Sequence, residues 1–160
     1  MSRQVLSRQA APALDAWARL LRGHASVTRA LSAELEAEHG LTINDYGALL
    51  LLSRADEGRL RRVDLAEELV LTASGVTRLL DGLERVGLVE RAACSSDRRV
   101  TYAVLTEAGR ERLEYASATH LAGIRAFLEE RFSKEELDHL AELLGRLPGA
   151  AGAAGSDCAA

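Results

Sequence analysis

Residues 74–91, which read SGVTRLLDGLERVGLVER, decide the fold class of this chain. Their spacing predicts an amphipathic helix with one buried face, since apolar side chains recur every three or four residues. These side chains are Val76, Leu79, Leu80 and Leu83. Thr72 is a good N-cap for this helix and Gly87 is expected to end it. Alternation of apolar and polar residues begins at Leu88, so the segment passes from a helix into a strand.

A shorter helical pattern lies immediately upstream, over residues 62–69. The positions expected to be buried are Val63, Leu65, Ala66 and Leu69. A three-residue connection separates this pattern from the helix that starts after Thr72. Two short helices joined by a tight turn are typical of a helix-turn-helix.

Downstream, the alternating pattern predicts two β-strands, at residues 88–91 and 100–105. The link between them, Ala92–Arg99, is polar and charged. We therefore expect a β-hairpin whose loop forms a wing beside the helix-turn-helix.

Long helical patterns flank this lobe on both sides. The first runs from Pro12 to about Glu38, and Gly40 closes it. Thr42, with Asp45 three residues later, is expected to cap a second helix that stops near Gly58.

Two more helices are predicted after the wing. Thr106 starts a helix that continues to about Phe132. The sequence Ser133–Glu136 has the form of a capping box and opens a last helix, which Pro148 ends.

The predicted order of elements is therefore α-α-α-α-β-β-α-α, a mainly α-helical winged helix-turn-helix fold with a small β-wing. The terminal helices carry more apolar positions than a small central core can cover, so we expect them to pair between two chains. The expected boundaries are an N-terminal dimerisation helix (1–40), the winged helix-turn-helix lobe (41–105), C-terminal dimerisation helices (106–148) and a disordered Gly/Ala-rich tail (149–160).

Composition narrows the class of protein. The first thirty residues are studded with arginines, and the longest apolar run, around Ala48–Leu52, is far short of the ~20 residues that span a bilayer. We therefore expect a cytoplasmic protein that does not contact membranes.

The histidines and cysteines form no metal-ligand spacing, and no phosphate loop or nucleophile elbow is present. Neither a metal, a cofactor nor an enzymatic activity is expected.

The net charge of −4 does not by itself favour a nucleic-acid partner. Residues 59–99 hold eight arginines against seven acids, so they carry +1 and the remaining chain carries −5. This bias is mild, and the position of each arginine matters more than the total.

Polar and basic side chains nevertheless gather where a helix-turn-helix meets duplex DNA. N-terminal side chains of the second helix project into the major groove, where base edges carry a donor–acceptor code. The expected DNA-facing positions there are Thr72, Ser74, Gly75, Thr77 and Arg78. Of these, Arg78 is the leading candidate for reading a base, and a phosphate contact is its alternative.

These segments resemble the MarR family (multiple antibiotic resistance regulators). The match runs from about Leu41 to Gly109 and is strongest over 74–91. That stretch is followed, at the family's spacing, by Asp97-Arg98-Arg99 and by the sequence LTEAG at 105–109. The resemblance implies a homodimer, a recognition helix in the major groove and a wing that reaches an adjacent minor groove. It also implies control by a small, often aromatic or anionic ligand, or by an oxidant.

The resemblance also assigns roles at the wing. Asp97 is expected to pair with and orient an arginine, and Arg99 corresponds to the family's minor-groove residue, with Arg98 beside it. A guanidinium in a narrow minor groove reads the shape of DNA more than its sequence.

The sequence departs from the family at two places. Ala73 and Gly75 stand where relatives usually have polar side chains, so direct base readout is expected to be sparse. Arg61 stands where Ser or Thr commonly caps the third helix. With Arg59 and Arg62 it forms either a phosphate-facing cluster, which gives affinity without specificity, or a group of solvated loop residues.

An effector site is predicted at Trp17, the only tryptophan, and His24. Some phenol- and urate-responsive relatives use a tryptophan with arginines between their lobes. The favoured alternative is that Trp17 packs at the dimer interface or against a neighbouring helix, and that His24 is an ordinary surface or hydrogen-bonded residue. Redox sensing by Cys94 is disfavoured, because peroxide-sensing relatives carry their reactive cysteine near the start of the first helix.

The leading hypothesis is a sequence-specific repressor that binds a pseudo-palindromic operator as a homodimer and is relieved by a small aromatic or anionic ligand. The alternative keeps the fold and the DNA but drops the sensing, which gives a constitutive or architectural DNA-binding protein. A winged helix used only for protein–protein contact would not explain Thr77, Arg78 and residues 97–99 at DNA-facing positions.

Overall fold

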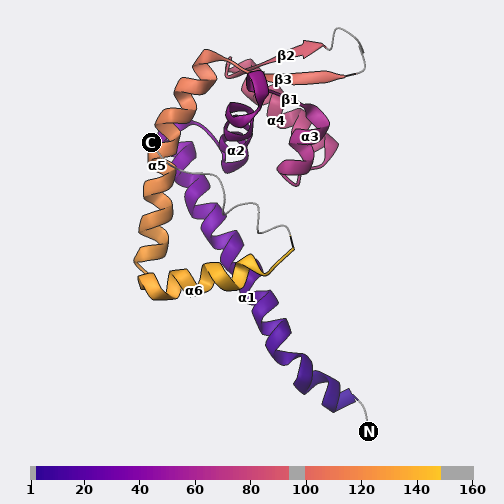
Figure 1. Ribbon diagram of the computed structural model, residues 1–160, viewed down its shortest axis with the longest axis vertical. Helices are drawn as coiled ribbons and strands as arrows, with labels where there is room; N and C mark the ends of the chain where they lie inside the picture. Colours follow the sequence, from indigo (N-terminus) through magenta and orange to yellow (C-terminus); the bar gives the residue numbers. More distant parts are fainter. Residues whose placement is uncertain (1–2, 94–99, 149–160) are drawn as a thin grey trace. The chain divides into compact units, whose positions relative to one another are not determined.

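The computed structural model describes residues 3–93 and 100–148 (Figure 1). The described chain divides between Leu121 and Ala122 into two compact units. The helices and strands follow in the order α1 (Arg3–His39), α2 (Ile43–Arg54), η1 (Asp56–Gly58), β1 (Arg59–Arg61), α3 (Arg62–Glu68), α4 (Ala73–Arg85), β2 (Val89–Ala93), β3 (Thr101–Leu105), α5 (Glu107–Glu129) and α6 (Lys134–Gly145). The winged helix-turn-helix prediction is confirmed. None of the helices in the described ranges combines the length and the apolar character needed to cross a membrane.

Side-chain caps begin the predicted helices where the sequence indicated. Thr42 and Asp45 form a complete capping box on α2, and Ser133 and Glu136 form another on α6. At α4 the Thr72 hydroxyl accepts the Gly75 N–H. Each cap satisfies amide groups that the first helical turn leaves without partners.

In the described residues the sheet has three antiparallel strands in the order β1-β3-β2, whereas only two strands were predicted. The missed strand, β1, pairs Leu60 with Ala103 and Arg61 with Tyr102. It escaped prediction because it is only three residues long and two of them are arginines. An edge strand this short depends on its neighbour for its conformation and leaves almost no alternating pattern in the sequence.

One apolar core lies inside the winged helix-turn-helix lobe and extends to α5. From α4 it includes Val76, Leu80 and Leu83, with Leu79 partly buried against them, so the predicted buried stripe is confirmed. Leu35 of α1 and Leu113 of α5 reach the same core. Each fully buried leucine contributes about 1.5–3 kcal/mol relative to an exposed one, which makes this core the main stabilising term of the lobe.

Two details of the helix prediction were wrong. The first helix begins at Arg3, not at Pro12, which lies inside α1 without an N–H to donate. Proline suggested a helix start because it suits the first helical position. Val63 was expected to be buried but is 57% exposed. It stands two residues before the buried Leu65, about 200° away around the helix, and therefore points outward.

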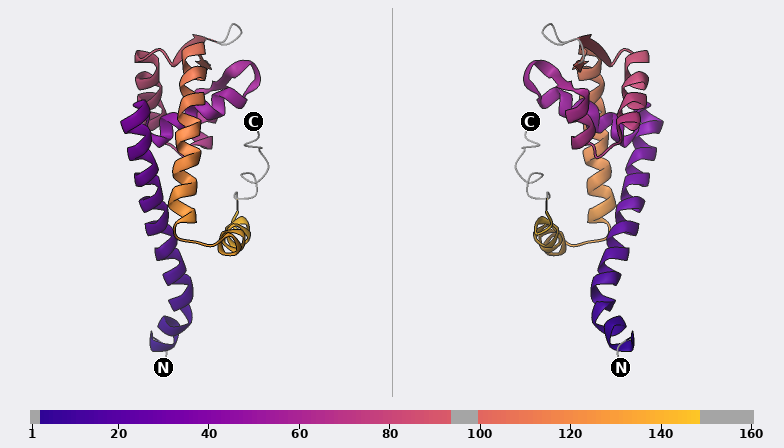
Figure 2. Two further views of the ribbon diagram at one scale, coloured as in Figure 1. Left: turned by 90° about the vertical axis from the view of Figure 1, so that its left-hand side faces the viewer. Right: turned by 90° about the vertical axis from the view of Figure 1, so that its right-hand side faces the viewer.

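The C-terminal part of α1 lies beside the first half of α5 (Figures 1 and 2). His39 Nε2 and Thr119 Oγ1 are hydrogen-bonded at 2.7 Å, and Arg112 donates to the His39 carbonyl at 2.7 Å. Nearby, the Tyr46 ring packs 4.5 Å from the His120 imidazole, and burial lowers the pKa of His120. These contacts fix one end of α1 to the lobe.

Farther along the terminal helices, large apolar side chains are exposed. On α1 they are Leu14, Trp17, Leu20 and Leu21, and near the other end of the chain they are Phe132, Leu143, Leu144 and Leu147. No residue of α6 is buried. Excess apolar surface on both terminal segments is what the sequence predicted for helices that pair with a second chain.

The junction between α4 and α5 is tightly built around the Leu88 carbonyl. The Thr106 N–H donates to that carbonyl at 3.2 Å, and the Thr106 hydroxyl donates to the Gly87 carbonyl at 2.7 Å. The same hydroxyl accepts the Gly109 N–H at 3.0 Å and so caps α5. A Cβ added at Gly109 would lie 2.1 Å from the Leu88 oxygen, so only glycine fits there.

We predict that Gly109→Ala destabilises the protein by about 2–3 kcal/mol, because the added methyl must displace backbone atoms in a packed region. Urea unfolding followed by circular dichroism measures the change. The matched control is Gly82→Ala, since a Cβ at Gly82 of α4 meets nothing within 4 Å. There alanine should stabilise the helix by about 0.5–1 kcal/mol. Equal effects at the two sites would contradict the tight junction.

The turn of the helix-turn-helix carries backbone strain at Val70. The Leu71 N–H donates to the Ala66 carbonyl and the Val70 N–H to the Glu67 carbonyl, which is a Schellman motif at the end of α3. Its central residue needs a positive φ, and Val70 has φ +53°. Gly87 fills the equivalent place after α4, at φ +74°. A β-branched residue is unfavourable in the left-handed region of φ/ψ space, so Val70 lowers the stability of the folded state.

We predict that Val70→Gly raises the free energy of unfolding by about 0.5–1 kcal/mol. Removing the left-handed strain of valine gains more free energy than is lost through the larger conformational entropy cost of ordering glycine on folding. Val70 is 91% exposed, so little packing is lost. The control is Val86→Gly, at an exposed valine with φ −97°, where no strain is relieved and stability should fall. A loss of stability in Val70→Gly would refute the assignment of strain.

Candidate nucleic-acid interface

The N-terminus of α4 is organised by the Thr72 hydroxyl. This oxygen accepts the Gly75 N–H at 3.1 Å and is 3.2 Å from the Ser74 hydroxyl. A Cβ at Gly75 would lie 3.1 Å from the same oxygen, a close contact that any larger residue would have to relieve. The structure thus gives Thr72 and Gly75 a local role in starting the helix, in addition to their predicted position on the DNA-facing side.

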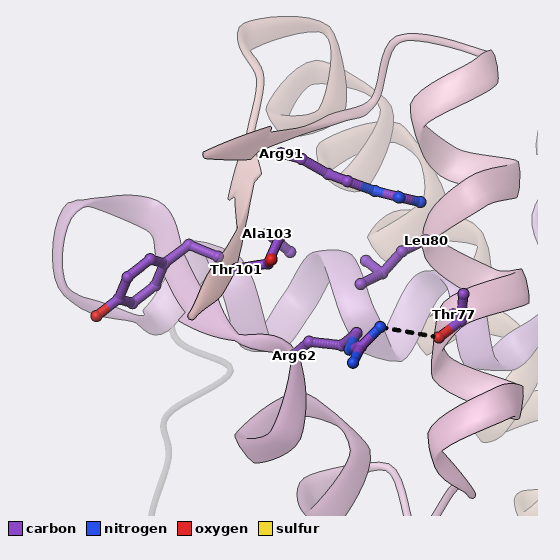
Figure 3. Close-up of a pocket in the computed structure, with 7 residues that line it drawn as sticks. Arg62, Thr77, Leu80, Arg91, Thr101 and Ala103 are labelled. Carbon is purple, nitrogen blue, oxygen red and sulfur yellow. Dashed lines mark hydrogen bonds between the residues drawn. The ribbon is translucent and has the colours of Figure 1, made fainter. Parts of the chain in front are cut away.

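Thr77 connects α4 to α3. Its hydroxyl donates to the Ala73 carbonyl at 2.8 Å and accepts from Arg62 Nη1 at 3.3 Å, the bond drawn in Figure 3. The Arg62 guanidinium is therefore held against α4 by a neutral group. Its positive charge stays exposed at the face where α3 and α4 meet.

Arg78 is exposed and extends from α4 with no hydrogen bond or ion pair to any residue in the described part of the chain. Ser74 lies four residues earlier and so shares its side of the helix. The predicted base-reading residue is thus a cation with nothing in the described lobe to neutralise it.

The three arginines of the predicted phosphate-facing cluster differ in their contacts. Arg59 pairs with Glu57 at 2.6 Å and lies over the Tyr102 ring. Arg61 makes a two-bond pair with Asp64, and this hydrogen bonding and charge raise the pKa of Arg61. Arg61 occupies the N-cap of α3 without a side-chain cap bond. Within residues 3–93 and 100–148, only Arg62 of the three has no carboxylate partner.

Arg91 on β2 was not among the predicted site residues, yet it lies against α4. It forms an ion pair with Asp81, and its Nε is 3.0 Å from Glu84 Oε2. Two carboxylates spaced three residues apart on a helix share one face. That spacing was visible in the sequence, but the strand residue that would meet it was not.

Arg62 and Arg91 also line a small pocket of about 60 Å³ beneath α4, together with Thr77, Leu80, Thr101, Tyr102 and Ala103. Figure 3 shows both arginine side chains directed toward α4.

The predicted wing residues, Asp97, Arg98 and Arg99, lie outside the described residues, as do Cys94 and the tail 149–160.

The two predicted effector residues lie on α1 but do not form one pocket. Trp17 is 58% exposed. His24 lines a shallow, open concavity whose other walls are also residues of α1, and Trp17 is not among them. No group of three or more His, Cys, Asp or Glu side chains in the described residues is arranged to hold a metal ion.

A capped helix with an uncompensated arginine, preceded by a short helix and followed by a β-hairpin, defines a winged-helix module of the nucleic-acid-binding class. Comparison with known proteins agrees. The MarR family model matches residues 39–100. The repressor YetL of Bacillus subtilis is 37% identical over 111 residues, which span 69% of this chain and 66% of YetL.

Solved structures extend the likeness. AbsC, a MarR family regulator from Streptomyces coelicolor, is 34% identical, with a TM-score of 0.72 over 82% of this chain and 88% of AbsC. Sco3205 from the same organism, solved in complex with DNA, is 28% identical with a TM-score of 0.75, covering 83% of each chain. CouR from Rhodococcus jostii RHA1, bound to p-coumaroyl-CoA, is 28% identical with a TM-score of 0.65, covering 79% of this chain and 86% of CouR. This chain belongs to the MarR family of transcriptional regulators.

We predict that Thr72→Ala destabilises the protein by about 1 kcal/mol, because the α4 N-terminus loses its cap. Thr72→Ser, which keeps the hydroxyl, should be close to wild type. Urea unfolding of the two variants separates capping from the loss of a methyl group. If both variants unfolded at the same denaturant concentration, the hydroxyl would not be capping the helix.

Proposed function

We propose that the chain represses transcription as a homodimer that binds a pseudo-palindromic operator in duplex DNA. The observation that carries this proposal is the exposed Arg78, with no partner in the described lobe, on a helix whose N-terminus is capped and fixed. The naming of YetL as a repressor supports the direction of regulation. Its relatives are transcriptional regulators, and we propose no enzymatic activity.

The proposed contacts divide into two kinds. Arg78 and Ser74 of α4 read base edges in the major groove, while Arg62 contacts a phosphate. Arg61, whose charge is shared with Asp64, is the weaker phosphate ligand of the pair. At the wing we retain Asp97, Arg98 and Arg99 as the minor-groove contacts. Sco3205 in its complex with DNA supports a DNA partner for this fold.

The homodimer follows from the terminal segments. We propose that residues 1–40 and 106–148 supply the dimer interface and 41–105 the DNA-binding lobe. Exposed Leu14, Trp17 and Leu21 on α1 support this, because apolar surface of that kind is normally covered. Two recognition helices related by a twofold axis then contact half-sites about one helical turn of DNA apart.

A small aromatic or anionic effector completes the proposal. CouR bound to p-coumaroyl-CoA supports ligand control within this fold. Trp17 and His24 remain the candidate contacts, from α1. The alternative function is a constitutive DNA-binding protein, which would have the same DNA-contacting face and no effector. In either case we propose that the protein acts in the cytoplasm.

Selection of binding sites from random-sequence duplexes, followed by competition with unselected DNA over a salt series, tests the proposal. A palindromic sequence that resists excess competitor supports a specific repressor. Weak binding that ignores sequence and disappears with salt would refute it. Addition of phenolic or anionic compounds to the specific complex then separates the effector-controlled protein from the constitutive one.

We predict that Arg78→Ala lowers affinity for the selected operator about tenfold to a hundredfold, because a good arginine–base contact contributes about 1–3 kcal/mol of discrimination. Affinity for random DNA should fall much less. Arg85→Ala is the matched control, since Arg85 is also exposed on α4 but lies in its last turn. Titration of both variants with both DNAs measures the difference. Equal losses at the two positions would remove the base-reading role of Arg78.

A further inference from the structure

Two acidic residues of α4, Asp81 and Glu84, follow the proposed base-reading arginine, Arg78. Asp81 follows Arg78 by three residues, and Glu84 follows Asp81 by three. Side chains three or four residues apart on a helix are neighbours. Among the four positions of α4 that neighbour Arg78 in this way, which are Ser74, Gly75, Asp81 and Gly82, only Asp81 carries a charge. Asp81 is therefore the carboxylate on α4 best placed to pair with Arg78.

In the structure Asp81 does not pair with Arg78. It forms an ion pair with Arg91 of β2, and Glu84 lies 3.0 Å from the Nε of the same guanidinium. One arginine thus holds both carboxylates, and all three side chains are a little under half exposed. The β2 strand is fixed in turn by its ladder with β3, in which Arg91 pairs with Ala103.

Arg62 provides an internal contrast, since it lines the same small pocket as Arg91. Arg62 is bonded to the hydroxyl of Thr77, so its charge remains available to a phosphate. Arg91 faces two carboxylates, so its charge is used within the protein. Although both are arginines close to α4, only Arg62 has the electrostatic character of a DNA ligand.

We infer that Arg91 is a positioning residue for DNA recognition: by holding Asp81 and Glu84 against the base of the wing, it keeps Arg78 available for DNA. Released from Arg91, Asp81 would have Arg78 three residues before it and Arg85 four residues after it. Pairing with Arg78 would occupy the base reader and so weaken specific binding. This inference rests on the proposed function, because it concerns the same DNA-contacting face.

The test is a double-mutant cycle for DNA binding. Arg91→Gln, the pair D81N/E84Q, and the combined triple variant are titrated with the selected operator and with random duplex over a salt series. In the wild-type background, Arg91→Gln should lower the ratio of specific to random affinity about fivefold, the size expected when one exposed ion pair competes for the site. In the D81N/E84Q background the same substitution should change the ratio less than about twofold.

A direct contact between Arg91 and DNA would give a different result. Arg91→Gln would then cost the same affinity in both backgrounds, and the dependence of log affinity on log salt would lose about one phosphate contact. That outcome overturns the inference, as does an unchanged ratio in the wild-type background. Arg19→Gln is the matched control, because Arg19 also pairs with a carboxylate, Asp15 at 2.8 Å, but on α1.

Thermal unfolding of every variant guards against loss of the fold. If Arg91→Gln does not fold, Arg91→Lys takes its place: it keeps one cation beside the two carboxylates and should retain the wild-type ratio. An Arg91→Lys variant that folds but loses specificity would overturn the inference. A wild-type protein with no operator preference would instead refute the proposed function itself, so the two failures are distinguishable.

Discussion

The Leu88 carbonyl, enclosed between Thr106 and Gly109, is the contact on which the arrangement of the lobe depends. Through it the end of α4, the start of β2 and the first turn of α5 meet at one point. A helix that reads DNA must keep a fixed direction, and α4 has its apolar face in the core and its C-terminus tied to this junction. Because α5 begins there, a displacement of its first turn would also move the end of α4.

The distribution of charge within the lobe is a second organising feature. Three of its arginines are paired with carboxylates inside the lobe: Arg59 with Glu57, Arg61 with Asp64, and Arg91 with Asp81 and Glu84. The net charge of the lobe is near zero, yet Arg62 and Arg78 have no carboxylate partner among the described residues. This explains how a protein of net charge −4 can present a DNA-binding face, since exposed and unpaired cations attract phosphates while paired ones contribute little.

The sequence allowed the long, strongly periodic elements to be predicted, and with them the fold. The α4 stripe, the caps at Thr42, Thr72 and Ser133, and the β-hairpin are all local patterns, and all are present. The features that were missed depend on contacts between distant segments. Strand β1 forms because β3 pairs with it. The ion pairs of Arg91 with Asp81 and Glu84 form because β2 lies against α4. The proposed DNA contacts share this limit, since position on a helix can be inferred from sequence whereas the partners of each side chain cannot.

The lone tryptophan has a practical consequence. Trp17 is the only tryptophan in the chain, and its side chain is exposed on the apolar side-chain cluster of α1 that includes Leu14 and Leu21. The indole emission of this protein therefore originates from a single, known position. Its wavelength and its accessibility to a quencher depend on what covers that part of α1. The chain thus carries its own optical reporter of association, which works without a label and without any change to the sequence.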